Sequence, residues 1–484
     1  MKLSELIKNL RPIEFTASGD IEISGISYDS RRTQPGDLFV AIKGFESDGH
    51  AFISNAVKAG ATAVLCQERP AEDVPYIAVE NSREALALVS AEFFGHPGDV
   101  MNVIGVTGTS GKTTTTHLIK KIIETVTGEK VGLIGTNGNM VGLELLHTEH
   151  TTPESYELQK LFRQMKDAGC SYVVMEVSSH SLVLDRVSGF RFAVAAYTNL
   201  SRDHLDFHGT MEAYADAKSM LFSRCDAACI NLDDEFAPMM IKAARCHVIT
   251  SSIGSPEAKL RADNVELSAE GVKFDAVYDG SSVPASLKIP GQFSVHNALT
   301  ALSCCIAAGI DLEDAAEALA GASGVKGRVE NVPTGSDFFV IIDYSHKPDA
   351  LENVLRTLRP VTKGRLMCLF GCGGDRDRTK RPIMGRVAAE YSDLVIVTSD
   401  NPRTEDPQAI IDEILTGLQD TDTPVLTICD RIEAIHRAID NASAGDVILL
   451  AGKGHEDYQI VGHEKHHMDE REIVADYLKE KGIL

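Results

Sequence analysis

The segment VIGVTGTSGKTTTT, residues 103–116, constrains the fold of this chain more than any other. An apolar run leads into a loop of small residues and then into a lysine and a row of threonines. In such a loop the backbone N–H groups can surround a phosphate at the N-terminus of a helix. The usual spacing would place a glycine at Val106, and Gly105 stands one residue earlier. The segment therefore predicts a variant P-loop, with a purely structural glycine-rich turn as the alternative.

The P-loop pattern gives its residues predicted roles. The loop backbone would hold the phosphates of ATP, the Lys112 side chain would reach the terminal phosphates, and the Thr113 hydroxyl could be a ligand of Mg²⁺. ATP and Mg²⁺ are therefore the predicted cofactors. The predicted nucleotide-binding residues of the loop are Gly108, Thr109, Ser110, Gly111, Lys112, Thr113 and Thr114.

Apolar runs of strand length alternate with helix-like stretches over most of the 484 residues, a length that exceeds one hydrophobic core. This alternation predicts an α/β fold with largely parallel sheets, whose ligands bind beyond the carboxyl ends of the strands. Three domains are predicted: a small N-terminal α/β domain at 1–98, a central P-loop parallel-sheet ATPase domain at 99–328, and a C-terminal Rossmann-like domain at 329–484. Within the central domain, residues 250 to 290 are expected to form an antiparallel excursion.

A formal net charge of −23 disfavours binding to nucleic acid and to anionic lipid. An anionic substrate would instead be held by individual Arg and Lys side chains. The ten cysteines have neither zinc-site nor disulfide-framework spacing, which indicates reduced thiols. The sequence lacks a secretory signal pattern, and no run reaches about 18 apolar residues. We therefore expect a monomeric cytoplasmic protein that acts on small molecules and has no nucleic-acid or membrane partner.

Two segments of the central domain carry candidate catalytic residues. MEVSSHSL places Glu176 at a strand end and His180 four residues later, where the carboxylate can hold Mg²⁺ and the imidazole can hold a second cation or orient a neighbour. Solvated side chains are the alternative for both. Lys218 lies in the acidic, helix-like stretch AYADAK, where a surface salt bridge is the commoner role of a lysine.

Polar loops also follow the apolar strands of the third domain, in DYSHKPDAL, GCGGDRDRTKRP, SDNPRTEDP and AGKGHEDYQ. Arg376 and Arg403 could each bind a carboxylate through two N–H groups, and Asp400 and Glu456 could hold ammonium groups. Together they match an amino acid that is charged at both ends. Loops joined by salt bridges are the alternative.

Taken together, these motifs resemble the Mur ligase family over nearly the whole chain. TGTSGKTT, EVSSH, TNLSRDHLDFHG, AYADAK, KGRVE, DYSHKPDAL and DNPR occur in the order that the family has. The early segments SYDSRRTQPGDLFVAIKG and DGHAFISNAVKAGATAVL are similar to the branch that adds the third residue of the peptidoglycan stem peptide.

The resemblance implies an ATP-dependent ligase that forms an amide bond between an acid and an amino acid. Its substrate would be UDP-N-acetylmuramoyl-L-alanyl-D-glutamate, activated as an acyl phosphate. The DNPR motif implies that the added amino acid is meso-diaminopimelate, because its extra carboxylate and ammonium groups suit Arg403 and its neighbours. The implied role is in peptidoglycan and cell wall biosynthesis.

The resemblance also assigns residues. Lys218 would be carbamylated, which turns a cation into a carboxylate-like magnesium ligand. The implied catalytic set is Lys112, Glu176, His180 and Lys218, and the implied metal ligands are Thr113, Glu176, His180 and the modified Lys218. Nucleotide contacts beyond the P-loop would come from Asn297, Arg328 and Asp343.

The implied substrate contacts fall into two groups. Those to the UDP-linked substrate are Ser30, for the UDP portion, and Thr151, Thr152, Ser178 and Arg186. Those to diaminopimelate are Arg376, Asp400, Asn401, Pro402, Arg403, Gly452 and Glu456.

Three other functions stay open at this point. One is the lysine-adding counterpart, and another is a folylpolyglutamate synthetase-like ligase, which would share the P-loop and the ATP-binding domains. The third is a non-catalytic, ATP-dependent regulatory protein. The N-terminal segments and DNPR argue against the folate-type ligase, and a binding module would not need Glu176, Lys218, Asp343 and Arg403 together.

Overall fold

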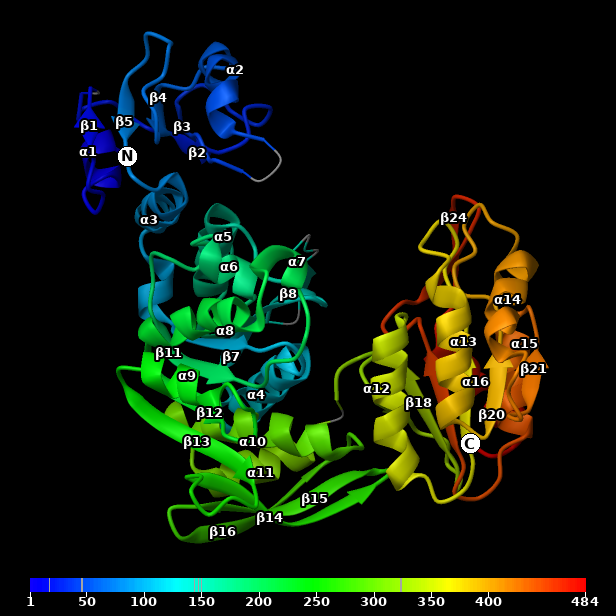
Figure 1. Cartoon of the computed structure of the whole chain (residues 1–484). Coiled ribbons are helices and arrows are strands. Elements are labelled where there is room, and N and C mark those ends of the chain that lie inside the picture. The colour runs from blue at the N-terminus through cyan, green and yellow to red at the C-terminus, as the bar shows by residue number, and fades with distance from the viewer. Residues whose placement is uncertain (17, 45–46, 143, 147, 149, 323) are drawn as a thin grey trace. The chain divides into compact units, whose positions relative to one another are not determined.

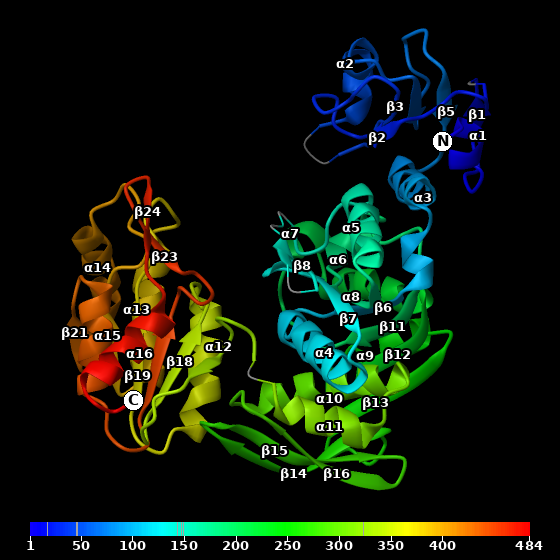
Figure 2. The ribbon, with the colours of Figure 1, turned by 180° about the vertical axis from the view of Figure 1, so that it is seen from behind.

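The computed structural model describes residues 1–16, 18–44, 47–142, 144–146, 148, 150–322 and 324–484 (Figures 1 and 2). It divides into two compact units. Unit 1 comprises Met1–Ser252, Glu257–Leu260 and Thr300–Ala315, and unit 2 comprises Ile253–Pro256, Arg261–Leu299 and Ala316–Leu484. Both units combine sheets with helices, which confirms the predicted α/β class. The domain boundaries predicted at 98 and 328 stay predictions.

The first part of unit 1 has a sheet of its own. Its strands lie in the order β1–β5–β4–β3–β2, all parallel except β1. The strand bounds are β1 Glu14–Phe15, β2 Gly25–Ser27, β3 Asp37–Val40, β4 Ala63–Cys66 and β5 Tyr76–Ala78. The helices are α1 Leu3–Leu6, α2 Ile53–Lys58 and α3 Ser82–Phe94, with a 3₁₀ helix at Gly49–Phe52. Strands β3, β4 and β5 are buried throughout, so their sequences do not alternate between apolar and polar residues, whereas both residues of β1 are exposed.

A second sheet forms the core of unit 1. Its strands follow the order β13–β12–β11–β6–β10–β7–β8–β9, and those from β13 to β7 are parallel. The strand bounds are β6 Asn102–Thr107, β7 Lys130–Gly135, β8 Gly138–Val141, β9 Glu144–Leu146, β10 Cys170–Glu176, β11 Phe192–Tyr197, β12 Cys225–Asn231 and β13 His247–Ile253. The predicted parallel strands are therefore present, and β6, which precedes the P-loop, is flanked by β10 and β11.

Helices connect these strands. They are α4 Lys112–Thr127, α5 Ser155–Asp167, α6 Ser179–Val183, α7 Leu205–His208, α8 Met211–Ser219 and α9 Ala237–Ala243, with 3₁₀ helices at Pro97–Val100 and Met220–Ser223. Phe162 of α5 packs with Val103, Val173 and Phe192 of the strands in one buried cluster. This packing fixes the carboxyl ends of the strands, where the predicted site residues lie.

Unit 2 contains the segment that was expected to be antiparallel. Strands β14 Leu260–Ser268, β15 Gly271–Tyr278 and β16 Ser281–Leu287 occupy it, and β15 pairs antiparallel with β16. Two helices, α10 Gln292–Ala307 and α11 Leu312–Ala320, come next in the chain. The antiparallel pairing expected between residues 250 and 290 is confirmed for β15 and β16, while the place of this segment in the central domain stays a prediction.

The rest of unit 2 is a sheet in the order β17–β18–β22–β19–β20–β21, parallel except for β17. The strand bounds are β17 Glu330–Val332, β18 Phe339–Asp343, β19 Leu366–Phe370, β20 Leu394–Val397, β21 Val425–Thr427 and β22 Val447–Ala451, with a hairpin of β23 Tyr458–Val461 and β24 Glu464–His467. Helices α12 Pro348–Leu358, α13 Lys380–Tyr391 and α14 Pro407–Leu415 pack together, as do α15 Arg431–Asp440 and α16 Glu470–Glu480, with 3₁₀ turns at Arg359–Val361 and Thr416–Leu418. Figure 1 shows α12 and α13 in front of this sheet, and the opposite view in Figure 2 shows α15 and α16.

None of the helices that the structure describes combines the length and the apolar character needed to span a lipid bilayer.

A buried ion pair joins α15 and α16 to the carboxyl end of this sheet. The Arg431 guanidinium lies 2.8 Å from the Glu470 carboxylate, and both side chains are 1% exposed. Arg431 also donates to the carbonyl oxygens of Ser399 (3.4 Å) and Ala451 (3.0 Å), which follow β20 and end β22. The pair therefore holds the helices against the strand ends that carry the candidate site.

Removing one partner of this pair should destabilise unit 2. We expect Glu470→Ala to lower the free energy of unfolding by about 3–5 kcal/mol, because it leaves a buried guanidinium without its counter-ion. Thermal unfolding followed by circular dichroism measures the effect. The control is Glu472→Ala in the same helix, where the carboxylate is 61% exposed and pairs with the exposed His467. Equal melting temperatures for the two variants would contradict this account.

Candidate functional site

The predicted P-loop connects β6 to α4. Gly108 has a φ of +150°, and a Cβ at this position would collide with the hydroxyl of Thr198 at the end of β11. Gly111, with a φ of +83°, is the N-cap residue of α4. Because α4 begins at Lys112, the positive end of the helix lies at the loop, as phosphate binding requires.

Asn199 holds the P-loop from the neighbouring strand. Its Oδ1 accepts a hydrogen bond from the Ser110 N–H over 3.0 Å, and its Nδ2 donates to the Ser110 carbonyl over 3.1 Å. Its own carbonyl accepts the Thr109 N–H over 2.8 Å. The sequence reasoning missed Asn199 and Thr198. The signal was the polar sequence TNLSRDH directly after an apolar strand.

Two lysines meet at one carbonyl oxygen of the loop. Lys112 Nζ and Lys218 Nζ each donate to the Gly108 carbonyl at 2.9 Å, and Lys112 also reaches the Thr109 carbonyl at 2.9 Å. Lys218 is 1% exposed and lies 4.5 Å from the ring of Tyr214. Burial, followed by the nearby Lys112 cation, lowers the pKa of Lys218 well below its ordinary value. Lys218 is therefore not the surface salt-bridge residue that its acidic segment suggested.

Glu176 ends β10 beside the P-loop helix. Its Oε1 accepts hydrogen bonds from the Thr113 hydroxyl and from the Thr136 N–H, both at 2.9 Å. The Thr136 hydroxyl donates to Oε2 at 3.2 Å and lies 3.0 Å from the Thr151 hydroxyl. The structure thus brings together the predicted metal ligands Thr113 and Glu176. Thr136, which sequence reasoning missed, directly follows the apolar run VGLIG.

The oxygen atoms of Thr113 and Glu176 fit a hard cation such as Mg²⁺. In the part of the chain that the structure describes, no three His, Cys, Asp or Glu residues form a metal-binding group. Mg²⁺ usually has one or two protein oxygen ligands and completes its shell with water and substrate phosphates. A hydroxyl and a buried carboxylate next to a phosphate loop are consistent with that preference.

His180 lies in a cluster of aromatic rings. Its ring centre is 4.1 Å from that of Phe207, 5.0 Å from that of His204 and 5.5 Å from that of His208. Burial, and then the neighbouring His204, lower the pKa of His180, and burial lowers the pKa of His208 to about 4. Both rings are therefore neutral near pH 7, the form in which an imidazole can accept a proton or a cation.

A pocket of about 650 Å³ in unit 1 contains the predicted substrate-binding residue Ser30. Arg83 and Glu154 also line this pocket. The Glu154 carboxylate lies 3.5 Å from Arg83 and 3.3 Å from Arg186. Arg186, another predicted substrate contact, is therefore held at the border of the Ser30 pocket.

Hydrogen bonds continue from Arg186 to the backbone of Glu176. Arg186 Nη1 donates to the Thr152 carbonyl over 3.1 Å. The Thr152 hydroxyl donates to the Glu176 carbonyl over 2.9 Å and accepts the Ser178 N–H over 3.1 Å. The predicted residues for the nucleotide-sugar peptide therefore form one connected group between the Ser30 pocket and Glu176.

Unit 2 has a pocket of about 570 Å³ at the carboxyl ends of its parallel strands. It contains all but one of the predicted diaminopimelate contacts: Arg376, Asp400, Asn401, Arg403, Gly452 and Glu456. Pro402 is the exception. Its carbonyl oxygen packs so closely on Gly374 that a Cβ there would collide with it, so the prediction that Pro402 contacts the ligand is not supported by the pocket lining.

Hydrogen bonds fix the side chains on one wall of this pocket. The fully buried Lys453 donates to Asn401 Oδ1 over 3.0 Å and to Glu456 Oε2 over 3.1 Å. Asn401 Nδ2 also donates to Glu456 Oε2, over 2.9 Å. Sequence reasoning missed Lys453, although it lies in AGKGHE directly after β22. Its cation offsets the charge of Glu456, whereas Asp400 also lines the pocket and could meet a ligand ammonium group.

The predicted nucleotide contacts of unit 2 include one adjacent pair. Asp343 Oδ2 accepts the Val329 N–H over 2.9 Å, and burial raises the pKa of this carboxyl group. The neighbouring Arg328 guanidinium lies 5.5 Å from the ring of Tyr344. Asn297 is buried in α10.

Comparison with known proteins identifies the family to which this chain belongs. Three family models match the chain in succession: the Mur ligase family, catalytic domain, over residues 22–94, the Mur ligase middle domain over 106–305, and the Mur ligase, glutamate ligase domain, over 327–454. The UDP-N-acetylmuramoyl-L-alanyl-D-glutamate--2,6-diaminopimelate ligase of Caldanaerobacter subterraneus subsp. tengcongensis is 47% identical over 483 residues, which cover 99% of each chain. The chain belongs to the Mur ligase family. The resemblance drawn from its motifs is confirmed.

Solved structures of other Mur ligases agree with this assignment. The structure of a UDP-N-acetylmuramoyl-L-alanyl-D-glutamate--2,6-diaminopimelate ligase is 33% identical, with a TM-score of 0.79, and covers 100% of this chain and 99% of that one. The MurF ligase of Thermotoga maritima in complex with ADP shares the fold at 17% identity, with a TM-score of 0.57 and coverage of 95% and 98%. As a Mur ligase, this chain is an ATP-dependent enzyme that forms amide bonds in peptidoglycan biosynthesis. The alternative of a non-catalytic regulatory protein is therefore set aside.

The conformation of the P-loop yields a test. We expect Gly108→Ala to weaken ATP binding by about tenfold or more, because the added methyl group collides with Thr198 and displaces the phosphate-binding backbone. Equilibrium binding of a fluorescent ATP analogue measures the loss. The control is Gly128→Ala at the other end of α4, where the φ is +71° and no atom lies within 4 Å of the added Cβ. Unchanged ATP affinity in Gly108→Ala would contradict the proposed role of the loop.

Proposed function

We propose that this Mur ligase joins meso-diaminopimelate to UDP-N-acetylmuramoyl-L-alanyl-D-glutamate and converts ATP to ADP and phosphate. The observation that carries the proposal is the pocket in unit 2. Arg403 and Asp400 of DNPR line this pocket together with Arg376 of the neighbouring loop. Relatives with 47% and 33% identity over the whole chain bear the name of this activity. We also propose that the enzyme is a monomer and acts in the cytoplasm.

The reaction would begin at the P-loop. The backbone N–H groups of 108–114 and the Lys112 ammonium group would hold the ATP phosphates, with Lys112 exchanging its carbonyl partners for phosphate oxygens. Thr113 and Glu176 would hold Mg²⁺, which supplies neutralisation of phosphate charge when bound. The substrate carboxylate attacks the γ-phosphorus, forming an O–P bond while the bond to ADP breaks. Positioning and charge neutralisation account for most of the catalysis in such transfers.

The second step would form the amide bond. The amine of diaminopimelate attacks the acyl carbon, the bond to phosphate breaks, and the nitrogen loses a proton to solvent. The UDP portion would lie at Ser30, and the peptide portion would lie along the group formed by Arg186, Thr152 and Ser178. This arrangement would bring the glutamate carboxylate towards Glu176 and the phosphate loop.

Lys218 is suited to carbamylation by its surroundings. Only a neutral amine can attack CO₂, forming a C–N bond with loss of a proton, and the pKa of Lys218 is lowered by burial and by Lys112. The product carries a negative charge next to the Lys112 cation, which would stabilise it. Its oxygen atoms could then serve as metal ligands near Thr113 and Glu176.

The choice of diaminopimelate follows from charge. Lysine lacks the second carboxylate, so it would leave the arginines at one end of the pocket without a counter-ion. Sites built to bind a polar group reject analogues that lack it far more strongly than apolar pockets reject a missing methylene. Arg403 and Arg376 therefore favour diaminopimelate over the lysine alternative.

The substrate preference is tested directly by phosphate release. Purified enzyme with ATP, Mg²⁺ and UDP-N-acetylmuramoyl-L-alanyl-D-glutamate should release phosphate rapidly with meso-diaminopimelate and at least about 100-fold more slowly with lysine. Release with lysine alone would keep the ligase but reject the reading of Arg403. Release with neither amino acid would reject the proposed pair of substrates.

The carbamate is tested by substitution of Lys218. We expect Lys218→Ala to lose about 100-fold or more of the activity, because a metal ligand is removed. Bicarbonate should not restore the activity, whereas a short carboxylic acid such as acetate should restore part of it. Lys121→Ala, on the exposed face of α4, is the control and should keep full activity. Full activity in Lys218→Ala would reject the carbamate.

A further inference from the structure

The two loops that carry the arginines of the unit 2 pocket have unusual backbone conformations. One loop follows β19 and contains Asp375 and Arg376, and the other follows β20 and contains Arg403. Asp375 has a φ of +54° and Arg403 a φ of +52°, in the left-handed region that residues other than glycine rarely adopt. Such conformations persist only where surrounding contacts hold them.

Several hydrogen bonds join the two loops. The Gly374 N–H donates to the Asn401 carbonyl over 2.9 Å, and Arg403 Nη1 donates to the Gly374 carbonyl over 2.8 Å. Thr404 donates its hydroxyl to Asp375 Oδ1 over 2.8 Å and its N–H to Oδ2 over 3.3 Å. The position of the Arg403 side chain therefore depends on the position of the first loop.

A charge cluster of Arg381, Glu405 and Glu413 lies behind these contacts. The Arg381 side chain is 0% exposed and binds both oxygens of Glu405, with Nη1 3.0 Å from Oε2 and Nη2 2.9 Å from Oε1. Arg381 also binds Glu413 of α14 at 2.8 Å. Such bidentate, charge-assisted bonds are strong and geometrically specific.

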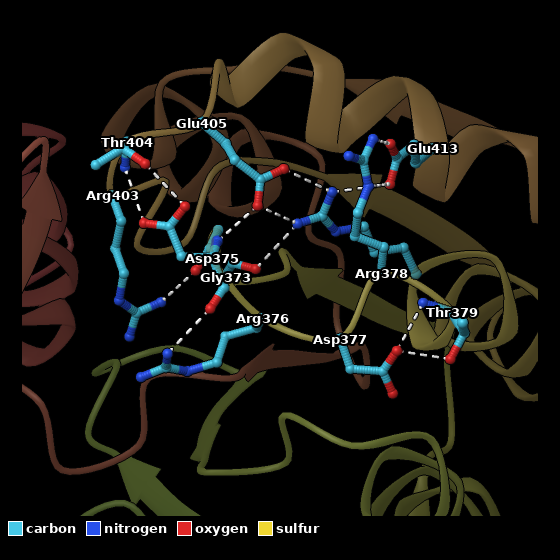
Figure 3. Close-up of polar contacts among 12 residues, drawn as sticks. Gly373, Asp375, Arg376, Asp377, Arg378, Thr379, Arg403, Thr404, Glu405 and Glu413 are labelled. Carbon is cyan, nitrogen blue, oxygen red and sulfur yellow. Dashed lines mark hydrogen bonds and ion pairs between the residues drawn. The ribbon is translucent and has the colours of Figure 1, made fainter.

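Glu405 connects this cluster to both loops. It belongs to the loop after β20, and its Oε1 accepts the Asp375 N–H of the other loop over 2.6 Å. Figure 3 shows the Glu405 carboxylate directed at Asp375, with the side chains of Arg376 and Arg403 extending away from it. Arg381 and then the Asp375 N–H lower the pKa of Glu405 to about 2, so the carboxylate is charged throughout the neutral range.

Neither Arg381 nor Glu405 is part of the pocket lining, whereas Arg376 and Arg403 are. The pair would therefore act on a ligand indirectly, through the lining residues that it positions, among them the two pocket arginines. Arg376 Nη1 donates to the carbonyl of Asp375 over 3.0 Å, which links it to the residue that Glu405 holds. A binding site loses affinity when its charged groups move by as little as about 0.5 Å to 1 Å.

We infer that the Arg381–Glu405 pair is a positioning device that aligns Arg403 and Arg376 and thereby sets the preference for an amino acid with a second carboxylate. The inference rests on the proposed function, since it concerns binding of diaminopimelate. It adds two residues outside the pocket to those that determine specificity.

Glu405→Gln tests the inference, because it keeps the size of the side chain and removes its charge. We expect the KM for meso-diaminopimelate to rise by about tenfold, while kcat and the KM for ATP change by less than about twofold. With lysine at a fixed high concentration, the variant and the wild-type enzyme should release phosphate at the same rate. The control is Glu413→Gln, which removes a carboxylate from the same Arg381 and contacts the first loop only at the exposed side chain of Arg378, away from Asp375 and Arg376. Its KM for meso-diaminopimelate should stay near the wild-type value.

The outcomes separate the two proposals. A wild-type enzyme that is inactive with meso-diaminopimelate would overturn the proposed function. An active wild type with an unchanged KM in Glu405→Gln would overturn the positioning role alone. Equal losses in both Gln variants, or a loss confined to kcat or to the KM for ATP, would also overturn it, since they would indicate a general structural effect.

A milder variant covers the case in which Glu405→Gln does not fold. Thr404→Val keeps the branched shape of the side chain and removes the hydroxyl bond to Asp375. We expect it to raise the KM for meso-diaminopimelate by about two- to threefold, with the KM for ATP unchanged. Wild-type kinetics in Thr404→Val would overturn the inference.

Discussion

The carbonyl oxygen of Gly108 is the point on which the nucleotide-binding half of this enzyme depends. Lys112 and Lys218 both donate to it at 2.9 Å, and two cations at such a distance from one atom repel each other. Burial and this repulsion favour a neutral Lys218, which is the state that a reaction with CO₂ needs. The carbonyl can occupy this position because Gly108 has no side chain to collide with Thr198. The backbone conformation at Gly108 therefore affects both the shape of the phosphate loop and the charge state of Lys218, a residue far from it in the sequence.

Unit 2 follows a second constraint, which is that buried charges must be paired. Arg431 with Glu470, Arg381 with Glu405 and Lys453 with Glu456 each join a polar loop or helix to the carboxyl edge of the sheet. Leaving any of these ions unpaired would cost several kcal/mol in the free energy of folding. Because the two partners of each pair neutralise each other, the charges that can act on a ligand come from other residues of the pocket lining, among them Arg376, Arg403 and Asp400. In a chain with a net charge of −23, anion binding depends on such individually placed cations.

Much of the fold could be predicted because strands and phosphate loops are encoded locally. The apolar runs before Gly108, Glu176 and Asp400 predicted buried parallel strands, and the polar residues after each run indicated the ligand-binding edge. Asn199, Thr136 and Lys453 were missed, although each also follows an apolar run. Their roles depend on which strands are neighbours, and β6 lies between β10 and β11, strands that come much later in the chain. Sequence order alone does not give this arrangement.

The sequence by itself determined the fold class, the phosphate loop and, through the order of its motifs, the family and the residue types of the site. These features depend on short segments whose hydrophobic pattern and backbone requirements are the same in any context. Only the tertiary structure decided that Lys218 is buried with a lowered pKa, that Pro402 lies outside the pocket lining, and that Glu405 connects two loops. Burial, desolvation and ion pairing arise between segments that are far apart in the chain. They are established only when packing brings those segments together and excludes water from them.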